Sequence, residues 1–217
     1  QARRSPNSYK QKFTELILPD LEPIEGSLRD LDLEIYLVPK TEGPLWNAYI
    51  HRYHYLGYTK AGGAQLRYFV KSKGRFVAFF SFSAAAWKVK PRDEFIGWSQ
   101  QQREQNLHLV VNNSRFLILP SVKVPHLASH LLSQMTRRLS TDWMRAYNYK
   151  PILLETFVQK NKFQGTSYKA ANWLYLGDTK GRGKFNNKHS SSVPVKTIWV
   201  YPLAKNIKNV VEKLPVQ

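Results

Sequence analysis

The most regular pattern of apolar and polar positions lies between residues 124 and 148. Apolar side chains recur there every four residues, and one further leucine widens the apolar stripe. The stripe consists of Leu127, Leu131, Leu132, Met135, Leu139 and Trp143. This spacing places the apolar side chains on one face of a helix and polar residues on the other. The pattern therefore predicts a long amphipathic helix that packs on a core.

Short apolar runs on both sides of this helix predict strands. RFLILPSV (115–122) precedes the helix and KPILLETFV (150–158) follows it. A strand, a helix of about 20 residues and a second strand form a unit whose two strands run parallel. Earlier in the chain, LRYFVKS and RFVAFFSFSA flank a turn at Gly74 and predict a hairpin. VKTIWVYPL (195–203) predicts a last strand.

Weaker patterns predict the remaining elements. Residues 45–55 have helical spacing of their apolar positions, and Gln100–Asn106 predicts a polar helix. The segment KPRDEFIGW (90–98) predicts a loop, and residues 161–177 predict a helix-rich connection. The predicted order is helix, hairpin, loop and helix, strand, long helix, strand, short helix and strand.

The charge of the chain separates an N-terminal extension from a basic domain. The formal net charge is +18, yet residues 1–42 hold eight of the 15 acids and six of the 33 bases. We therefore divide the chain into an arm and acidic connector (1–43) and a basic domain (44–217). A positive surplus of this size attracts a polyanion, which favours DNA, or RNA, as the partner. A basic protein without such a partner, or one that touches acidic lipid, is the alternative.

Composition excludes several other classes of protein. The chain has no cysteine, so disulfides, cysteine zinc sites and a thiol nucleophile are excluded. No apolar run is long enough to cross a bilayer, and we expect no membrane partner. These features agree with a cytoplasmic location, where thiols stay reduced.

The predicted order of elements resembles the core of the GNAT fold, the acyl-CoA transferase superfamily. The resemblance implies an α+β domain, with helices flanking a mixed central sheet that splays open and with Glu155 facing the cleft. In these transferases, glycines before the long helix let the backbone approach the pyrophosphate of CoA. Here the turn SVKVPHLAS contains Pro125 and no glycine, although Ser129 and the helix start remain as anion ligands. The turn therefore argues against CoA as a cofactor.

Two basic, turn-rich segments carry most of the predicted nucleic-acid contacts. They are KVKPRD (88–93) and GDTKGRGKFNNKH (177–189), in which basic side chains and glycine N–H groups contact phosphates. The predicted contact residues are Lys88, Lys90, Arg92, Arg103, Arg115, Lys169, Lys180, Arg182, Lys184 and Lys188. Trp87, Trp98 and Trp173 are candidates for stacking on bases, but we expect core packing for at least two of them.

His54, Asp93 and Glu155 are the candidate catalytic residues. If they converge, their side chains predict a Mg²⁺ site for phosphodiester hydrolysis, and the chain is then a nuclease. His54 alone is a candidate general base, or a hydrogen-bonded structural residue between two tyrosines. The sequence leaves open whether any reaction is catalysed.

The structural alternative is that the acids neutralise bases within the fold. Glu155 ends an apolar strand, where a carboxylate is costly to bury unless it is paired. The candidate partners of Glu155 are Arg115, Lys169 and Arg182, with Arg115 or Arg182 as the expected pair, and those of Asp93 are Arg92 or Arg103. In this reading Glu155 anchors the cleft.

Several motifs resemble the DruA family, whose members belong to the Druantia anti-phage defence system. The motifs are YHYLGY (53–58), LRYFV (66–70), FSFSAAAWKVKPRDEFIGW (80–98), NLHLVVNNSRFLILPSVKVPHLAS (106–129), LLETFV (153–158) and GTSYKAANWLYLGDTKGRG (165–183). The resemblance implies a bacterial defence or mobile-element setting, with other defence proteins as partners, and it implies no known reaction. We therefore expect a nucleic-acid binding protein, with an acyl-CoA transferase or a nuclease as the alternative.

Overall fold

The computed structural model describes residues 16–181 and 193–213. Its centre is a seven-stranded mixed sheet with the order β2-β3-β4-β5-β7-β9-β8. The strands are β2 (Leu33–Leu37), β3 (Gln65–Ser72), β4 (Arg75–Ala84), β5 (Val110–Ile118), β7 (Leu153–Gln159), β9 (Lys196–Pro202) and β8 (Leu174–Asp178). Neighbouring strands are antiparallel except β5 and β7, which run parallel as predicted.

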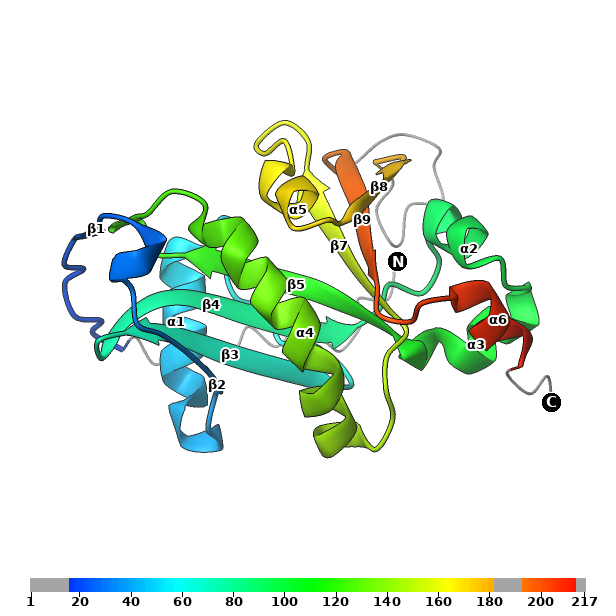
Figure 1. The fold of residues 1–217 in the computed structure, drawn as a ribbon, viewed down its shortest axis with the longest axis horizontal. Helices are drawn as coiled ribbons and strands as arrows, with labels where there is room; N and C mark the ends of the chain where they lie inside the picture. Colours follow the sequence, from blue (N-terminus) through cyan, green and yellow to red (C-terminus); the bar gives the residue numbers. More distant parts are fainter. Residues whose placement is uncertain (1–15, 182–192, 214–217) are drawn as a thin grey trace, which may run out of the picture.

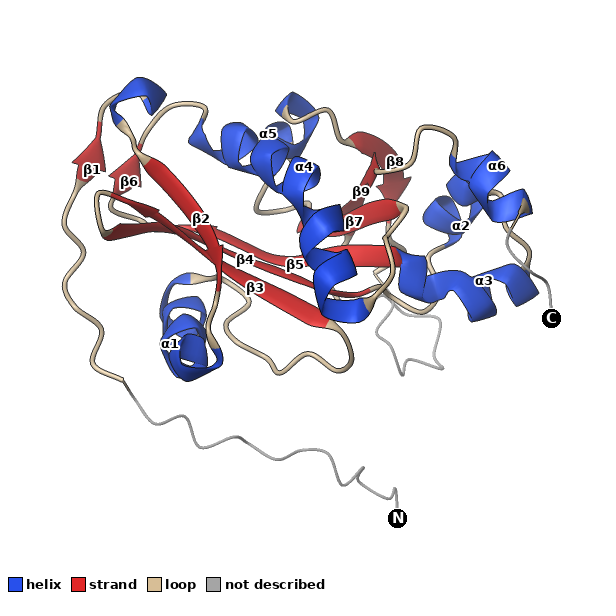
Figure 2. Ribbon diagram, turned by 60° about the horizontal axis from the view of Figure 1, so that its bottom comes forward, coloured by secondary structure: helices blue, strands red, loops and turns tan. Residues whose placement is uncertain are grey.

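Helices cover both faces of this sheet. Helix α4 (Leu127–Tyr147) crosses one face and α1 (Gly43–Tyr53) lies on the opposite face (Figure 1 and Figure 2). The shorter helices are α2 (Lys90–Ile96), α3 (Gln100–Asn106), α5 (Thr166–Ala170) and α6 (Ile207–Glu212), with 3-10 turns η1 (Leu28–Asp30), η2 (Lys40–Glu42) and η3 (Leu107–Leu109). No helix in the described part of the chain is both long and apolar enough to span a membrane. The α+β architecture with a mixed central sheet is confirmed.

The long amphipathic helix is confirmed as α4. All residues of its predicted apolar stripe are buried against the sheet. Asp142, on the same helix, accepts hydrogen bonds from the Tyr68 hydroxyl on β3 (3.0 Å) and from Arg138 Nε (2.8 Å). Arg138 also donates to the carbonyl oxygen of Ile35 on β2. These bonds hold α4 to the part of the sheet that precedes the parallel pair.

Two segments differ from the prediction. Residues 90–98, predicted as a loop, contain helix α2, in which Pro91 occupies the first turn and Gly97 ends the helix with a left-handed φ of 80°. Proline is favourable in the first turn because its missing N–H needs no partner there. The connection 161–177 is only in part helical, because residues 174–178 form β8 and pair with β9.

The acidic N-terminal segment joins the fold at two places. Residues 33–37 form β2, which pairs antiparallel with β3 as an edge strand of the sheet. In a separate two-stranded sheet, β1 (Ile24–Glu25) pairs parallel with β6 (Val122–Lys123). β6 lies in the turn between β5 and α4. The segment predicted as a connector therefore contributes backbone pairing to the domain that follows it.

The sheet opens between its two parallel strands. β5 and β7 pair only where residues 110–112 face residues 153–155, and they no longer pair beyond this point. β7 continues to pair with β9 along its whole length. The opening separates the sheet into two parts and leaves a space that other segments line.

Candidate nucleic-acid interface

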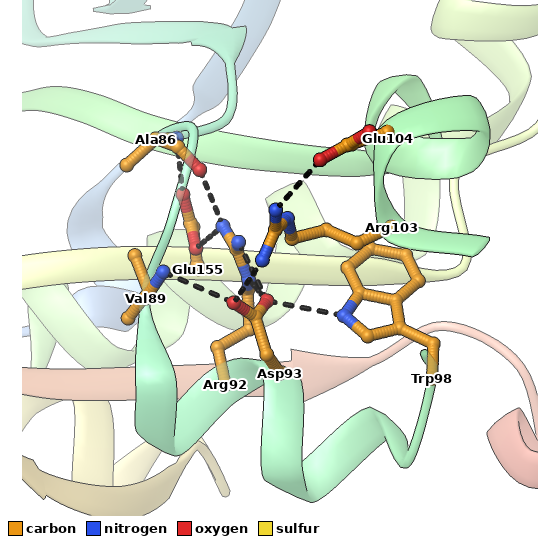
Figure 3. Close-up of polar contacts among 8 residues, drawn as sticks. All are labelled: Ala86, Val89, Arg92, Asp93, Trp98, Arg103, Glu104 and Glu155. Atoms are coloured by element: carbon orange, nitrogen blue, oxygen red, sulfur yellow. Dashed lines mark hydrogen bonds and ion pairs between the residues drawn. The ribbon is translucent and has the colours of Figure 1, made fainter. Parts of the chain in front are cut away.

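Glu155 stands at the last residue pair before the sheet opens, opposite Asn112. Its side chain is fully buried, with an exposed fraction of 0%. Glu155 Oε1 accepts the Ala86 N–H at 2.8 Å, and Oε2 accepts Arg92 Nη1 at 2.9 Å (Figure 3). The expectation that Glu155 pairs with a buried base is confirmed, but the partner is Arg92 and not Arg115.

Asp93 completes a charged network around Arg92. Arg92 Nη2 and the Trp98 indole N–H both donate to Asp93 Oδ1, at 2.7 and 3.1 Å (Figure 3). Arg103 lies 3.9 Å from Asp93 Oδ2 and 3.3 Å from Glu104, so the predicted pairing of Asp93 with Arg92 and Arg103 is confirmed. The network joins α2 and α3 to β7.

Burial affects both the pKa of Glu155 and the access of solvent to the arginines of this network. Burial raises the pKa of the Glu155 carboxyl, while the Arg92 guanidinium and the Ala86 N–H act in the opposite direction. Arg92 is fully buried and Arg103 is 6% exposed. Neither side chain reaches a phosphate in solution, so burial removes both from the predicted nucleic-acid contacts.

The candidate catalytic residues do not come together as one site. Asp93 and Glu155 are joined through Arg92, whereas His54 lines a separate hollow that Glu155 does not line. Among residues 16–181 and 193–213, no three His, Asp or Glu side chains are placed to hold a metal ion. The oxygens of both acids are already engaged with cations and N–H groups, which does not fit a Mg²⁺ site.

The separate hollow occupies the opening between the two parallel strands. Its volume is about 690 Å³, within the range of small-molecule sites. The lining residues are 53–56 at the end of α1, 113, 114 and 116–118 on β5, 156–158 on β7, and 162–168 leading into α5. We call this space the β5–β7 hollow. The prediction that Glu155 faces the cleft is wrong, because its side chain points to Ala86 and Arg92 instead.

Four basic side chains lie at or near the hollow, and we call them the basic cluster: His54, Arg115, Lys162 and Lys196. His54 and Lys162 line the hollow itself, Arg115 lines a smaller pocket that shares Ser114 with it, and Lys196 lines neither. Arg115 donates to the carbonyl oxygens of Gly57 (3.0 Å) and Ser114 (2.7 Å) and to the Thr59 hydroxyl (3.0 Å). In the described part of the chain, no carboxylate forms an ion pair with Arg115, Lys162 or Lys196.

Arg115 affects the pKa values of two other members of the basic cluster, His54 and Lys196. Burial, and then the charge of Arg115, lowers the pKa of His54 to about 4. The same two causes, in the same order, lower the pKa of the Lys196 ammonium. His54 Nδ1 accepts the Leu56 N–H at 3.2 Å, so the proton of the neutral ring resides on Nε2. Nε2–H is therefore the donor of this ring.

Aromatic side chains form the mouth of the hollow. Tyr55 is 37% exposed and Phe163 is 49% exposed, with ring centroids 5.1 Å apart and planes at 60°. His54 stacks on Tyr55 at 4.9 Å, and Lys162 Nζ lies 5.3 Å from the Tyr55 ring centroid. The mouth therefore combines exposed ring faces with positive charge.

Deeper in the hollow the polar groups are neutral and well bonded. Tyr168 donates its hydroxyl proton to Asn113 Oδ1 at 2.8 Å, and Thr156 Oγ1 donates to the Asn113 carbonyl oxygen at 3.0 Å. Burial raises the pKa of the Tyr168 phenol far above its ordinary value. No aspartate or glutamate is present among the lining residues, all of which lie in the described ranges.

The remaining predicted contact residues lie in several places. Lys88, Lys90, Lys169 and Lys180 are exposed, whereas Arg182, Lys184 and Lys188 lie outside the described residues. Trp98 and Trp173 are buried as expected, and Trp87 is 60% exposed.

Sequence reasoning missed four residues at the hollow: Tyr55, Lys162, Phe163 and Lys196. The first belongs to the motif YHYLGY, and the next two follow directly after the strand that carries Glu155. The neighbouring Lys162 and Phe163, shortly after a strand, were the available signal. No sequence signal indicated Lys196, because its position beside the hollow depends on the pairing of β9 with β7.

The turn before α4 does not fit a CoA pyrophosphate. Its backbone already pairs with residues 24–25 through β6, and Glu25 lies 3.7 Å from Lys123. Ser129 donates its hydroxyl proton to the His126 carbonyl oxygen, and the helix has no side-chain cap. A pyrophosphate at this turn would have to displace an acidic segment, and we derive no acyl-transfer step from it.

Comparison with known proteins identifies the fold and the family of this chain. Solved structures with the same fold include a mutant agmatine N-acetyltransferase (9% identity, 79% of this chain and 100% of that chain, TM-score 0.50). Two further solved structures to which the chain is similar are the polyamine N-acetyltransferase of Drosophila melanogaster (8%, 79% and 100%, TM-score 0.49) and a mutant spermidine N-acetyltransferase of Vibrio cholerae (8%, 82% and 98%, TM-score 0.49). At 9% identity, the likeness to the agmatine N-acetyltransferase shows the fold alone.

At the level of sequence, no curated protein matches the chain. The family model described as "Druantia protein DruA" matches residues 1–193, which is most of the chain and includes the motifs that suggested the resemblance. The chain therefore belongs to the DruA family, built on the fold of the GNAT acetyltransferases.

Proposed function

We propose that this DruA-family protein binds nucleic acid, in the first place DNA, as part of a bacterial anti-phage defence system. The observation that carries the proposal is the basic cluster at the β5–β7 hollow. Arg115 and Lys196 are half-buried cations, and no carboxylate in the described residues pairs with either of them. An anion from outside the chain is the partner that such a cluster fits best.

The cost of burial supports an anionic ligand. Cations removed from water without a counter-ion are unfavourable, and a phosphate that enters the cluster offsets that cost. Most acids of the basic domain are unavailable for this purpose, because they already pair elsewhere. These acids are Asp93, Glu94, Glu104, Asp142, Glu155 and Asp178.

A polymer of phosphates fits the surroundings better than a single anion does. Lys162 stands at the mouth, Lys169 is exposed on α5, and Lys180 is exposed beyond β8. The net charge of +18 accelerates encounter with a polyanion and gives salt-dependent affinity. Exposed Tyr55 and Phe163 add ring faces that stack on bases, as in proteins that bind single strands.

A salt titration of DNA binding tests the proposal. Fluorescence anisotropy of a labelled oligonucleotide is measured against KCl concentration for the wild type and for the double variant Arg115→Gln, Lys196→Gln. Each lost phosphate contact lowers the slope of log affinity against log salt by about 0.7–0.9, so we expect a loss of about 1.5.

The matched control removes the same charge elsewhere. Arg145 and Lys208 are exposed residues outside the hollow, and the double variant Arg145→Gln, Lys208→Gln has the same net charge as the test variant. We expect it to keep a slope near that of the wild type. Equal losses in both double variants would reject the basic cluster as the binding site, and absence of binding in the wild type would reject the function.

A further inference from the structure

The basic cluster accounts for phosphate binding but leaves the interior of the β5–β7 hollow without a role. The hollow has a volume of about 690 Å³, more than a phosphate needs, and its interior groups are neutral. We propose that the hollow receives one unpaired, unstacked nucleobase of a bound strand, so that the protein recognises nucleotides that have left a duplex. This inference rests on the proposed function and adds to it the feature of the nucleic acid that is recognised.

The rings at the mouth are placed for contact with a base. Tyr55 and Phe163 meet at 60°, so they form two sides of a corner rather than one continuous stack. A planar ring that stacks on one of them meets the other edge-on, which is a favourable aromatic arrangement. Both side chains are exposed, although the rest of the fold buries most of its large aromatic residues. A stacked base would cover apolar surface that water now contacts.

The interior suits an uncharged heterocycle. Gln164, Thr166 and Ser167 line the hollow with neutral donors and acceptors, and Phe116 and Leu117 add apolar contact. Among these described lining residues there is no carboxylate to repel a nucleotide. Phosphate charge is matched outside by Arg115 and Lys196, so the base and its phosphate have separate places.

A base held in a regular duplex does not fit this arrangement. Its faces are stacked on neighbouring bases and its edge is paired, so it must be unstacked before it enters a pocket. Extrusion costs a few kcal/mol for a paired base and least for a base that is already unpaired. The protein is therefore expected to prefer bulged, mismatched or single-stranded nucleotides over a perfect duplex.

The test compares three duplexes that differ at one position. The first is perfectly paired, the second carries one extra unpaired adenine, and the third carries an abasic residue at the same bulge. Anisotropy at a fixed salt concentration gives the affinity of each. Because stacking of one base on an aromatic side chain supplies much of the gain, we expect the adenine bulge to bind about tenfold more tightly than the other two.

Two variants locate the base. Phe163→Ala removes a ring at the mouth, and because Phe163 is 49% exposed its truncation leaves the core intact. We expect it to bind the adenine bulge, the abasic bulge and the perfect duplex with equal affinity, so that the preference for the bulge is abolished. Trp87→Ala removes another exposed ring, one that lies beside Arg103 and outside the hollow. This control is expected to keep the preference.

Each outcome separates the inference from the proposed function. Equal, salt-dependent affinity for all three duplexes would overturn the inference and leave the proposed function standing. Loss of the bulge preference in Trp87→Ala, with the preference kept in Phe163→Ala, would have the same meaning. Failure to bind any duplex or single strand would overturn both. Titration with dAMP tests whether a free nucleotide is the ligand. If dAMP displaces the bulged duplex completely at concentrations near the dissociation constant of that duplex, recognition of a strand is overturned.

Discussion

Arg92 Nη1 lies 2.9 Å from Glu155 Oε2, and both side chains are completely buried. The two residues are 63 positions apart in the chain, one on α2 and one on β7. The pair explains why a chain with so many bases keeps a carboxylate at this place. Glu155 is the counter-ion of a buried arginine, and it fixes the α2 segment to the strand beside the opening of the sheet.

Replacing Glu155 with glutamine is expected to destabilise the fold strongly. The change leaves the Arg92 guanidinium buried without its counter-ion, and breaking a buried pair in this way costs about 3–5 kcal/mol. Urea denaturation followed by tryptophan fluorescence measures the loss. Glu94→Gln is the control, because the exposed Lys90–Glu94 pair contributes no more than about 0.5 kcal/mol. A folded Glu155→Gln protein with unchanged stability would contradict the structural role.

Gly165 is expected to tolerate no larger residue. It opens α5 with φ of +72°, and a Cβ at this position would stand 2.7 Å from the Trp199 ring. Left-handed strain and overpacking together predict a loss of about 2–4 kcal/mol for Gly165→Ala in thermal unfolding. Gly62→Ala is the control, because a Cβ there meets no atom within 4 Å and we expect little change. Similar unfolding midpoints for the two variants would refute the prediction.

His54 is expected to make stability depend on pH in acid solution. The pKa of His54 is about 4 in the folded protein and has its ordinary value of 6.5 in the unfolded chain. Between pH 4 and pH 6.5, unfolding is therefore accompanied by the uptake of a proton. The free energy of unfolding therefore decreases as the pH falls from 6.5 toward 4, by at most about 3 kcal/mol. Urea denaturation across this range measures the slope.

Two histidine variants isolate this effect. His54→Gln removes the titrating ring and should flatten the pH dependence between 6.5 and 4. His130→Gln changes an exposed histidine on α4 and should keep the slope of the wild type. If His54→Gln retains the full slope, another group is responsible and the burial of His54 is not the cause.

The sequence predicts those parts of the fold that depend on local periodicity. The stripe from Leu127 to Trp143 indicates a helix because each member lies one turn from the next. Parallel pairing of the flanking strands follows from the length of that helix, and the motifs at 53–183 indicate the family through their residues alone. These features do not depend on which distant residues meet.

The site depends on contacts that sequence spacing does not reveal. The partner of Glu155 was missed because Arg92 lies in a segment that looks like a loop and becomes buried only when α2 packs against β8, β9 and α6. The opening of the sheet was expected from the resemblance to the GNAT fold, but the lining of the hollow was missed for a similar reason. Its lining comes from four separate segments, and Lys196 approaches Arg115 only through the pairing of β9 with β7.

Photo-crosslinking tests most directly where the bound base lies. A duplex carrying one unpaired 5-iododeoxyuridine is bound to the wild-type protein and irradiated, and the crosslinked peptide is identified by mass spectrometry. Iodouracil reacts with nearby aromatic side chains, so our account predicts adducts on Tyr55 or Phe163 at the mouth of the β5–β7 hollow. Adducts confined to Trp87, or to any segment away from residues 53–56 and 162–168, would contradict it.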